Sequence, residues 1–445
     1  MKKTAAFLSL GCKVNSYETE AMRESFVSAG YDIVDFKELA DVYVINTCTV
    51  TNIADRKSRQ MLHQAKKRNP EAIIAAVGCY VQASEEALLE DSSVDIVVGN
   101  NKKSDIVTLV ERYQESRNKE ELVVDINQER EYENLMVSST MDKTRVFIKI
   151  QDGCNRFCSY CIIPYVRGRV RSRDFEDILA EIKELADKGY KEFVLTGIHI
   201  SSYGTDKKNA EDEDEERMPL AELIVEVGKI DGIERIRLGS LEPRIITEPF
   251  VQKIAGVKQF CPHFHLSLQS GSNSVLKRMN RKYSADEYYE KVLLLKKYFD
   301  NPAFTTDIIV GFPGETDEEF QETLEFVKKI GFSQIHVFKY SQRAGTVAAK
   351  MPDQIPQIKK NERSNALTEV ATAMSKEYKA LFKGRIEKIL IEEEIEIGDK
   401  KYQIGHNERY LKLAIDSNHN YTNTIKEAKV IKDLTDEILY CEIIH

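Results

Sequence analysis

The sequence predicts a multidomain α/β protein with an open parallel α/β sheet at the N-terminus, a partial (βα)6 barrel in the centre and a small antiparallel β-barrel at the C-terminus. Short apolar runs alternate with amphipathic segments over residues 1–112, and the alternation resumes with six repeats inside residues 143–372. Five short strand-like runs fill residues 375–445, from FKGRIEKILIEEE to EILYCEII. The charge-rich stretch 113–142 is predicted to be a linker with one edge strand.

In the first part, buried strands are expected at AAFLSLG, DVYVINT, AIIAAVG and VDIVVGN, with helices between them. Cys12, Cys48 and Cys79 each follow one of these strands. The carboxyl ends of the strands in an open parallel sheet face one crevice, so we expect the three thiols to converge there. The alternative is that they are small apolar residues capping strands in a core.

In the central part, six predicted strands alternate with helices such as FEDILAEIKELADKG, and the chemistry of such a barrel lies at the carboxyl ends of its strands. Cys154, Cys158 and Cys161 follow the first strand in the motif GCNRFCSYC. A structural zinc site needs four protein ligands. A four-iron cluster with three thiolates keeps one iron open for a substrate or cofactor. A zinc site completed by His199, or three unrelated thiols, is the alternative.

Composition narrows the class of protein. The chain has 445 residues, 42% of them hydrophobic and 31% charged, as in ordinary globular proteins. It has no apolar run long enough to span a bilayer, and we expect a cytosolic protein with no membrane association. Eight cysteines in such a chain indicate metal binding or redox chemistry; Cys261 and Cys441 are assigned to packing. The acidic stretch 205–217 is predicted to be a solvated loop.

The spacing C-x3-C-x-Φ-C after the first strand of a partial barrel resembles the radical S-adenosylmethionine (SAM) superfamily. This resemblance implies a [4Fe-4S] cluster whose open iron chelates SAM, and reductive cleavage of SAM to a 5′-deoxyadenosyl radical. It also implies that Tyr160 lies near the adenine of SAM. Further candidates for SAM or substrate contacts stand at or near the carboxyl ends of strands two to five: Gly197, Glu242, Gln269 and Asp307. The alternative is that Gly197 permits a tight turn and that the two carboxylates pair with arginines.

Other motifs narrow the resemblance. LGCKVNSYE, NTCTVT and VGCY, together with DGCNRFCSYCIIPYVRGRVRSR and DIIVGFPGET, are similar to the methylthiotransferases, and the last segment resembles their RNA-binding TRAM domain. This implies a second [4Fe-4S] cluster on Cys12, Cys48 and Cys79 that delivers sulfur, and an electron donor such as flavodoxin or ferredoxin; the sulfur source stays unassigned. LGCKVN and YVRGRVRSR look most like the branch that modifies C2 of N6-threonylcarbamoyladenosine at nucleotide 37 of tRNA. The alternatives are isopentenyladenosine in tRNA, a ribosomal-protein side chain, or a metal-containing RNA-binding protein without turnover.

RNA contacts need local basic surfaces, because the net charge is −9. Arg167, Arg169, Arg171 and Arg173 alternate with other residues, which predicts a phosphate-binding stripe on one face of an extended segment. The alternative is ion pairing with acidic residues. Residues 375–445 contain twelve Lys and Arg against fourteen Asp and Glu, so RNA binding there would be confined to a patch. The candidates for that patch are Lys383, Arg385, Lys388, Arg409 and Lys412.

Overall fold

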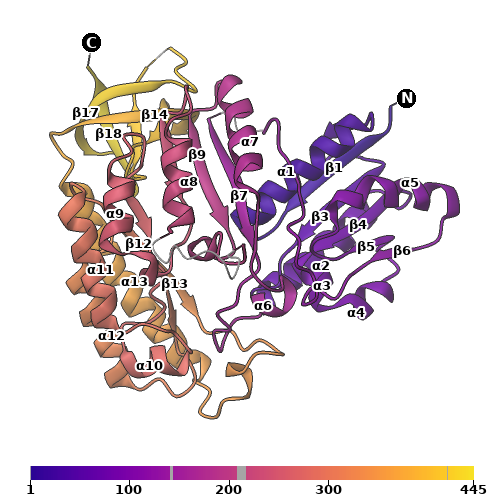
Figure 1. The fold of residues 1–445 in the computed structure, drawn as a ribbon, viewed down its shortest axis with the longest axis horizontal. Helices are drawn as coiled ribbons and strands as arrows, with labels where there is room; N and C mark the ends of the chain where they lie inside the picture. Colours follow the sequence, from indigo (N-terminus) through magenta and orange to yellow (C-terminus); the bar gives the residue numbers. More distant parts are fainter. Residues whose placement is uncertain (1, 141–143, 208–216, 418, 445) are drawn as a thin grey trace.

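The computed structural model describes residues 2–140, 144–207, 217–417 and 419–444. Figure 1 shows the three predicted parts: an N-terminal sheet in indigo and violet, a central barrel from magenta to orange, and a yellow C-terminal barrel at one end of the central one. The predicted fold class is confirmed in these parts. Most of the predicted acidic loop, residues 208–216, lies outside the described residues. In the described part of the chain, no helix is both long and apolar enough to cross a membrane.

The N-terminal sheet is parallel throughout, with strand order β2-β1-β3-β4-β5-β6. Its central strands are buried on both faces, which explains their continuous apolar runs. The sheet extends beyond the predicted boundary at residue 112, because the last helix runs to Ser116 and β6 pairs with β5 inside the predicted linker. The strands are β1 (Thr4–Ser9), β2 (Asp32–Val34), β3 (Val42–Thr47), β4 (Ile73–Gly78), β5 (Ile96–Val98) and β6 (Glu120–Leu122), and the helices are α1 (Lys13–Ser28), α2 (Asn52–Arg68), α3 (Cys79–Ala83), α4 (Glu85–Leu89), the 3-10 turn η1 (Lys103–Asp105) and α5 (Ile106–Ser116).

The central part is a half barrel of six parallel strands. One sheet has the order β10-β9-β7-β8 and the other the order β11-β12-β13, and the bridges Ile236–Phe260 and Leu241–Leu266 join them. Only the two-residue strand β8 (Arg171–Ser172) runs antiparallel to its neighbour among the described strands of these sheets. The parallel strands are β7 (Arg145–Asp152), β9 (Glu192–Gly197), β10 (Arg235–Leu238), β11 (His263–His265), β12 (Ala303–Val310) and β13 (Gln334–Lys339).

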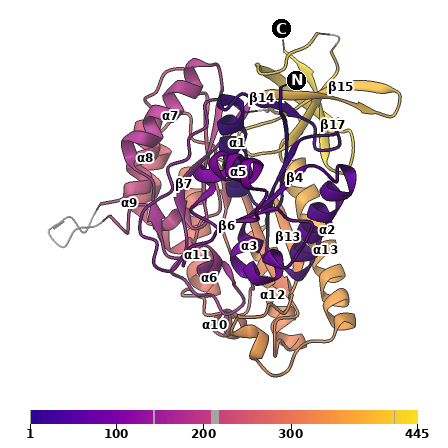
Figure 2. The same ribbon diagram turned by 90° about the vertical axis from the view of Figure 1, so that its right-hand side faces the viewer.

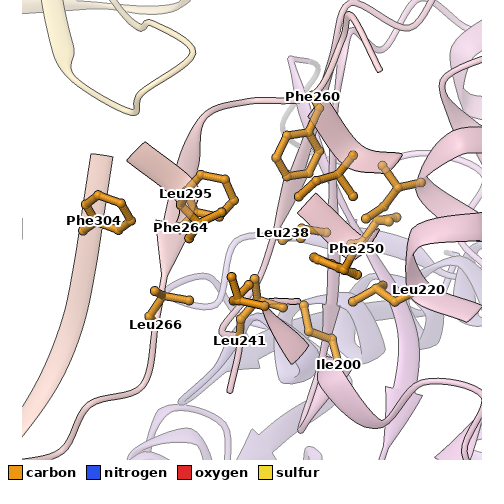
Figure 3. Packing of buried hydrophobic residues seen from close by; sticks show 14 of the residues in the cluster. Ile200, Leu220, Leu238, Leu241, Phe250, Phe260, Phe264, Leu266, Leu295 and Phe304 are labelled. Carbon is orange, nitrogen blue, oxygen red and sulfur yellow. The ribbon is translucent and has the colours of Figure 1, made fainter. Parts of the chain in front are cut away.

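Helices cover the outer face of this half barrel. Alternate residues of the strands point outward into one large hydrophobic core, part of which is visible in Figure 3 between Ile200 and Phe304. The residues between them face inward. The helices and turns are α6 (Ile163–Val166), α7 (Phe175–Asp187), η2 (Ile200–Ser202), α8 (Pro219–Val227), η3 (Pro243–Ile245), α9 (Glu248–Ala255), α10 (Asn273–Arg278), α11 (Ala285–Tyr298), α12 (Asp317–Ile330), η4 (Ala348–Lys350) and α13 (Gln357–Ala380).

The C-terminal strands close into a barrel in the order β14-β15-β16-β18-β17. The predicted antiparallel arrangement needs one correction, because β16 and β18 pair in parallel. Arginines of the central barrel fix this barrel in place: Arg235 donates to the carbonyls of His406 and Lys388 at 2.7 Å each, and Arg145 pairs with Glu392 at 2.6 Å. The strands are β14 (Ile386–Ile397), β15 (Lys400–His406), β16 (Lys412–Ile415), β17 (Ile425–Asp433) and β18 (Ile438–Ile443).

Candidate active site

The structure brings Cys12, Cys48 and Cys79 together at the carboxyl edge of the N-terminal sheet. Cys12 caps α1 and is exposed, whereas Cys48 and Cys79 are buried. Gly11 makes the approach possible: its φ is +103°, and a Cβ atom there would lie 2.8 Å from the Cys48 Sγ atom. Burial raises the pKa of the Cys48 thiol to about 11. Metal binding would therefore have to displace the proton.

A buried group of charges surrounds the inner side of Cys79. The Arg167 Nε atom donates to the Cys79 Sγ atom at 3.2 Å, and the same guanidinium bonds Glu18 at 2.7 Å and Asp152 at 3.0 Å. Lys149 reaches both of these carboxylates, and Lys103 reaches Glu18 at 3.1 Å. All five charged side chains are at most 4% exposed. The group joins α1 and η1 of the first domain to β7 and the cysteine loop of the second.

The charges in this group do not balance. Three cations face two carboxylates, and Arg171 adds a fourth cation 3.9 Å from Asp152. The Arg171 Nε and Nη2 atoms have no hydrogen-bond partner among the described residues. An excess of buried positive charge is costly unless an anion lies beside it. Thiolates binding an anionic iron–sulfur cluster at Cys79 would supply that anion, so the residues present fit such a group.

The second set of thiols, Cys154, Cys158 and Cys161, lies in the loop that follows β7. Burial raises the pKa of Cys154 to about 11 and that of Cys161 to about 12. The Arg281 Nη1 atom donates to the Cys158 Sγ atom at 3.3 Å, so a cation stands beside this set too. Asn280 and Met279 hold the loop through the Phe157 carbonyl at 2.9 Å and the Ser159 amide at 3.0 Å.

The two sets of thiols are connected through α6. Ile162, Ile163 and Val166, directly after Cys161, pack against Cys79 in one apolar cluster. Asn100 donates to the Val166 carbonyl at 2.7 Å and lies 3.6 Å from the Cys79 Sγ atom. Figures 1 and 2 show α6 beside α3 at this junction of the two domains. The carboxyl ends of both sheets therefore open onto one site.

Of the residues predicted to contact SAM, Tyr160 packs against an aromatic ring and Glu242 is held in a network of polar side chains. Tyr160 packs against Phe312, with ring centroids 6.5 Å apart and the rings edge to face. Glu242 bonds His199 at 2.9 Å and Arg156 at 2.6 Å. Burial raises the pKa of Glu242, but the hydrogen bond from His199 and the charge of Arg156 outweigh it and hold that pKa below its usual range. The second nitrogen of His199 lies 2.7 Å from Ser202, which leaves neither nitrogen free to complete a zinc site.

Gly197, Gln269 and Asp307 complete this group of candidates. Gly197 ends β9, where a Cβ atom would lie 2.8 Å from the Gln151 carbonyl oxygen. Gln269 follows β11 with a φ of +73° and shares a backbone bridge with Ile308. Asp307 lies in the middle of β12 and not at its carboxyl end, and it bonds His265 at 3.3 Å. It therefore lies deeper in the barrel than the end of its strand, and its contact with SAM or substrate stays a prediction.

The predicted arginine stripe is also wrong for three of its four members. Arg167, Arg171 and Arg173 are at most 1% exposed, and Arg173 is ion-paired with Glu181. They point toward the interior, where Glu18 and Asp152 pair with Arg167 and Glu181 pairs with Arg173. Only Arg169 of the four is exposed, and its guanidinium stacks 4.6 Å above the Phe157 ring. Arg385 is exposed on the C-terminal barrel, while Arg409 donates to the carbonyls of Asp300 and Asn301 and helps to dock that barrel.

Sequence reasoning missed the residues that support Cys79. Asn15 and Glu18 lie on the face of α1 that follows Cys12, and both bond Arg167. The signal was present in CKVNSYE, because two successive spacings of three place Cys12, Asn15 and Glu18 on one helix face. The partner Arg167 stands far away in sequence, and no local pattern connects the two.

Comparison with known proteins agrees with this geometry. The Radical SAM superfamily profile matches residues 148–327, and that of the Uncharacterized protein family UPF0004 matches residues 4–99. The Threonylcarbamoyladenosine tRNA methylthiotransferase MtaB of Bacillus subtilis is 42% identical over 96% of this chain and 94% of its own length. The tRNA-2-methylthio-N(6)-dimethylallyladenosine synthase of Thermoanaerobacter pseudethanolicus is 40% identical over 86% of this chain and 80% of its own length.

Among solved structures, the radical S-adenosylmethionine methyltransferase TsrM of Kitasatospora setae is similar in fold, with a TM-score of 0.54 and 14% identity over 76% of this chain and 73% of that one. An identity of 14% shows a similarity of fold and gives no information about function. The identity and coverage of the curated relatives, together with the two matching profiles, settle the family. The chain belongs to the radical SAM tRNA methylthiotransferases.

Proposed function

We propose that this enzyme adds a methylthio group to C2 of N6-threonylcarbamoyladenosine at nucleotide 37 of tRNA, using two [4Fe-4S] clusters. The observation that carries the proposal is the meeting of two three-cysteine sets at one site, joined by the packing of α6 on Cys79. The name of the Bacillus subtilis relative supports the choice of nucleoside.

The reaction explains why two metal sites are needed. The hydrogen on C2 of an adenine is not acidic, so no side chain with a pKa near neutrality can remove it as a base. When bound, the clusters would supply a 5′-deoxyadenosyl radical from SAM and the sulfur that the carbon receives. The protein's own task is to hold the reacting groups together and to exclude water.

Named residues carry out that task in this proposal. Cys154, Cys158 and Cys161 would hold the SAM-cleaving cluster, with Arg281 balancing the charge beside Cys158. Cys12, Cys48 and Cys79 would hold the sulfur-donating cluster, with Arg167 beside Cys79. Around the first cluster, the candidates for SAM contacts are Tyr160, Gly197, Glu242 and Gln269.

The RNA contacts belong to the same proposal. Arg169 and Arg385 are exposed cations that can reach phosphates. We assign the C-terminal barrel as a TRAM domain, with Lys383, Lys388 and Lys412 as further candidates for tRNA contacts. Electrons would come from a small donor such as flavodoxin or ferredoxin.

Nucleoside analysis of tRNA from a deletion strain tests the substrate. We expect the methylthio group to disappear from threonylcarbamoyladenosine while the unmodified parent nucleoside accumulates. The second candidate is isopentenyladenosine, favoured by the 40% identical dimethylallyladenosine relative. Loss of the methylthio group from isopentenyladenosine instead, or unchanged tRNA, would contradict the proposal.

Two cysteine variants test the division of labour between the clusters. Cys158→Ala is expected to abolish the reductant-dependent formation of 5′-deoxyadenosine. Cys48→Ala is expected to retain SAM cleavage but to form no methylthiolated tRNA. Normal product formation by Cys48→Ala would exclude a role for the second set of cysteines.

A further inference from the structure

The inner face of β11–β13 carries a polar cluster that the chemistry above does not use. The neighbours of His265, Asp307 and His336 along their strands, such as Leu266, Ile308 and Ile335, belong to the outer hydrophobic core, so these three side chains point into the half barrel. Their ligand-type atoms lie within 4.8 Å of one another. The His336 side chain is exposed despite its position inside the barrel.

Lys13 of the first domain lies on the inner side of the half barrel, where it acts electrostatically on His336. It is the first residue of α1, directly after Cys12, and α1 packs against β7 and β9. The Lys13 Nζ atom lies 5.8 Å from the ring centroid of Phe147, an inward-facing residue of β7. Within the described residues, Lys13 forms no ion pair. Its charge also contributes, after burial and the neighbouring imidazole of His265, to a lowered pKa of His336.

Arg281 and Ser267 connect the strand that carries His265 to the SAM-cleaving site. Arg281, which donates to the Cys158 Sγ atom, also donates to the Ser267 carbonyl at 3.3 Å. Ser267 is two residues beyond His265, a separation of about 7 Å along an extended chain. A nucleobase held beside the cysteine loop would therefore extend a substituent of a few bonds onto His265, Asp307 and His336.

The chemistry of the cluster selects among substituents. The Lys13 ammonium group and the His336 imidazole can donate to an anion, and the Asp307 carboxylate accepts a hydrogen bond from a hydroxyl or amide group. An apolar chain in the same place would leave these groups desolvated without partners, which is unfavourable. A hollow of about 530 Å³ lies at the amino ends of β11–β13, between these strands, α13 and the C-terminal barrel, and it is lined among others by His263, Thr305 and Gln334.

We propose that Lys13, His265, Asp307 and His336 form the subsite for the carboxylate and hydroxyl groups of the threonylcarbamoyl substituent. Lys13 and His336 bind the carboxylate, and Asp307, oriented by His265, accepts a hydrogen bond from the hydroxyl group. This inference rests on the proposed function and explains how the enzyme would distinguish this nucleoside from isopentenyladenosine, whose substituent is a hydrocarbon.

A divalent metal is the other ligand that two histidines and one aspartate suggest. The surroundings favour the anion. The Lys13 ammonium group acts electrostatically on His336, and it would repel a metal ion bound beside that imidazole. The His265 Nδ1 atom lies 3.0 Å from the Thr305 hydroxyl, a contact that orients the ring for Asp307.

Steady-state kinetics on anticodon stem-loop RNAs test the subsite. The substrates carry either threonylcarbamoyladenosine or isopentenyladenosine at the target position, and the enzymes are the wild type, Lys13→Met, Lys13→Arg and His336→Leu, all with both clusters reconstituted. Loss of a hydrogen bond to a charged group corresponds to a KM for the threonylcarbamoyl RNA that is raised about tenfold or more. We expect this rise in Lys13→Met and His336→Leu with kcat nearly unchanged, and partial rescue in Lys13→Arg.

Lys37→Met is the matched control, because Lys37 is exposed and follows β2, away from the cysteines. Iron content reports whether Lys13→Met disturbs the cluster on Cys12, and His336→Leu, on β13, tests the subsite independently of that cysteine. A wild type inactive on the threonylcarbamoyl RNA would refute the proposed function. An active wild type whose KM is unchanged in His336→Leu would overturn only the subsite. A non-cluster metal that copurifies with the wild type and is lost in His336→Leu would overturn the anion site in favour of a metal site.

Discussion

Replacing Arg167 by Met tests the buried charge group that joins the two catalytic domains. Burial raises the pKa of Glu18, but Arg167, Lys103 and Lys149 together outweigh it and hold that pKa well below its usual range. Arg167 is the largest of these three favourable contributions. Its removal leaves Glu18 and Asp152 buried with fewer partners and removes the cation beside Cys79.

The expected magnitude follows from the complete burial of the pair. Arg167 and Glu18 are both 0% exposed, so solvent does not screen their interaction. Removing one partner of a buried ion pair destabilises a protein by about 3–5 kcal/mol. We expect a loss near the lower end of this range, because Lys103 and Lys149 still pair with Glu18 when Arg167 is replaced.

Urea denaturation of the cluster-free protein measures the effect, with Arg169→Met as the matched control. Arg169 lies two residues away but is exposed, and its stacking on Phe157 contributes about 0.5–1 kcal/mol. We expect the first unfolding transition to move to lower urea in Arg167→Met and to remain nearly in place in Arg169→Met. Equal, small shifts in the two variants would refute the assignment of Arg167 to a buried network that supports stability.

Three further predictions follow from single positions. The Cβ atom of Gly11→Ala would collide with Cys48. We therefore expect this variant to lose the iron bound by Cys12, Cys48 and Cys79 and to keep the iron bound by the second set of cysteines, as measured by iron analysis. Retention of all the iron would contradict this prediction. Burial raises the pKa of Glu192, but the charges of Arg237 and Arg145 outweigh it and hold that pKa far below its usual 4.5. Ionised Glu192 therefore stabilises the fold above pH 4.5, and this contribution is lost as the solution is acidified. We expect the free energy of unfolding of Glu192→Gln to fall less steeply between pH 7 and 3 than that of the wild type, and an equal fall in both proteins would count against the prediction. Arg169→Met is expected to lower the slope of log tRNA affinity against log salt concentration by about one. Arg173→Met should leave that slope unchanged, because the Arg173 side chain is buried. Equal slopes in the wild type and Arg169→Met would show that Arg169 does not contact tRNA.

The architecture was predictable because periodicity and strand-end positions are local signals. Apolar runs such as DVYVINT and AIIAAVG identify buried parallel strands, and the cysteine after each one marks the carboxyl edge of the sheet. The six repeats of the central part likewise correspond to β7 and β9–β13. The edge strand expected in the charged stretch is β6, but its pairing with β5, which extends the N-terminal sheet past residue 112, has no local signal in the sequence.

The partners of charged residues could not be predicted in the same way. An alternating run of arginines has the same appearance in sequence whether it faces solvent or the interior. Arg167 is buried because Glu18, 149 residues earlier, and Asp152 lie across the domain junction, and only the fold brings them together.

Iron analysis of anaerobically reconstituted wild type and Cys48→Ala, with Mössbauer spectroscopy to identify the cluster type, addresses the two-cluster claim most directly. If each set of cysteines holds one cluster, we expect about eight irons per chain in the wild type and about four in Cys48→Ala, all in [4Fe-4S] clusters. About four irons in both proteins would contradict it.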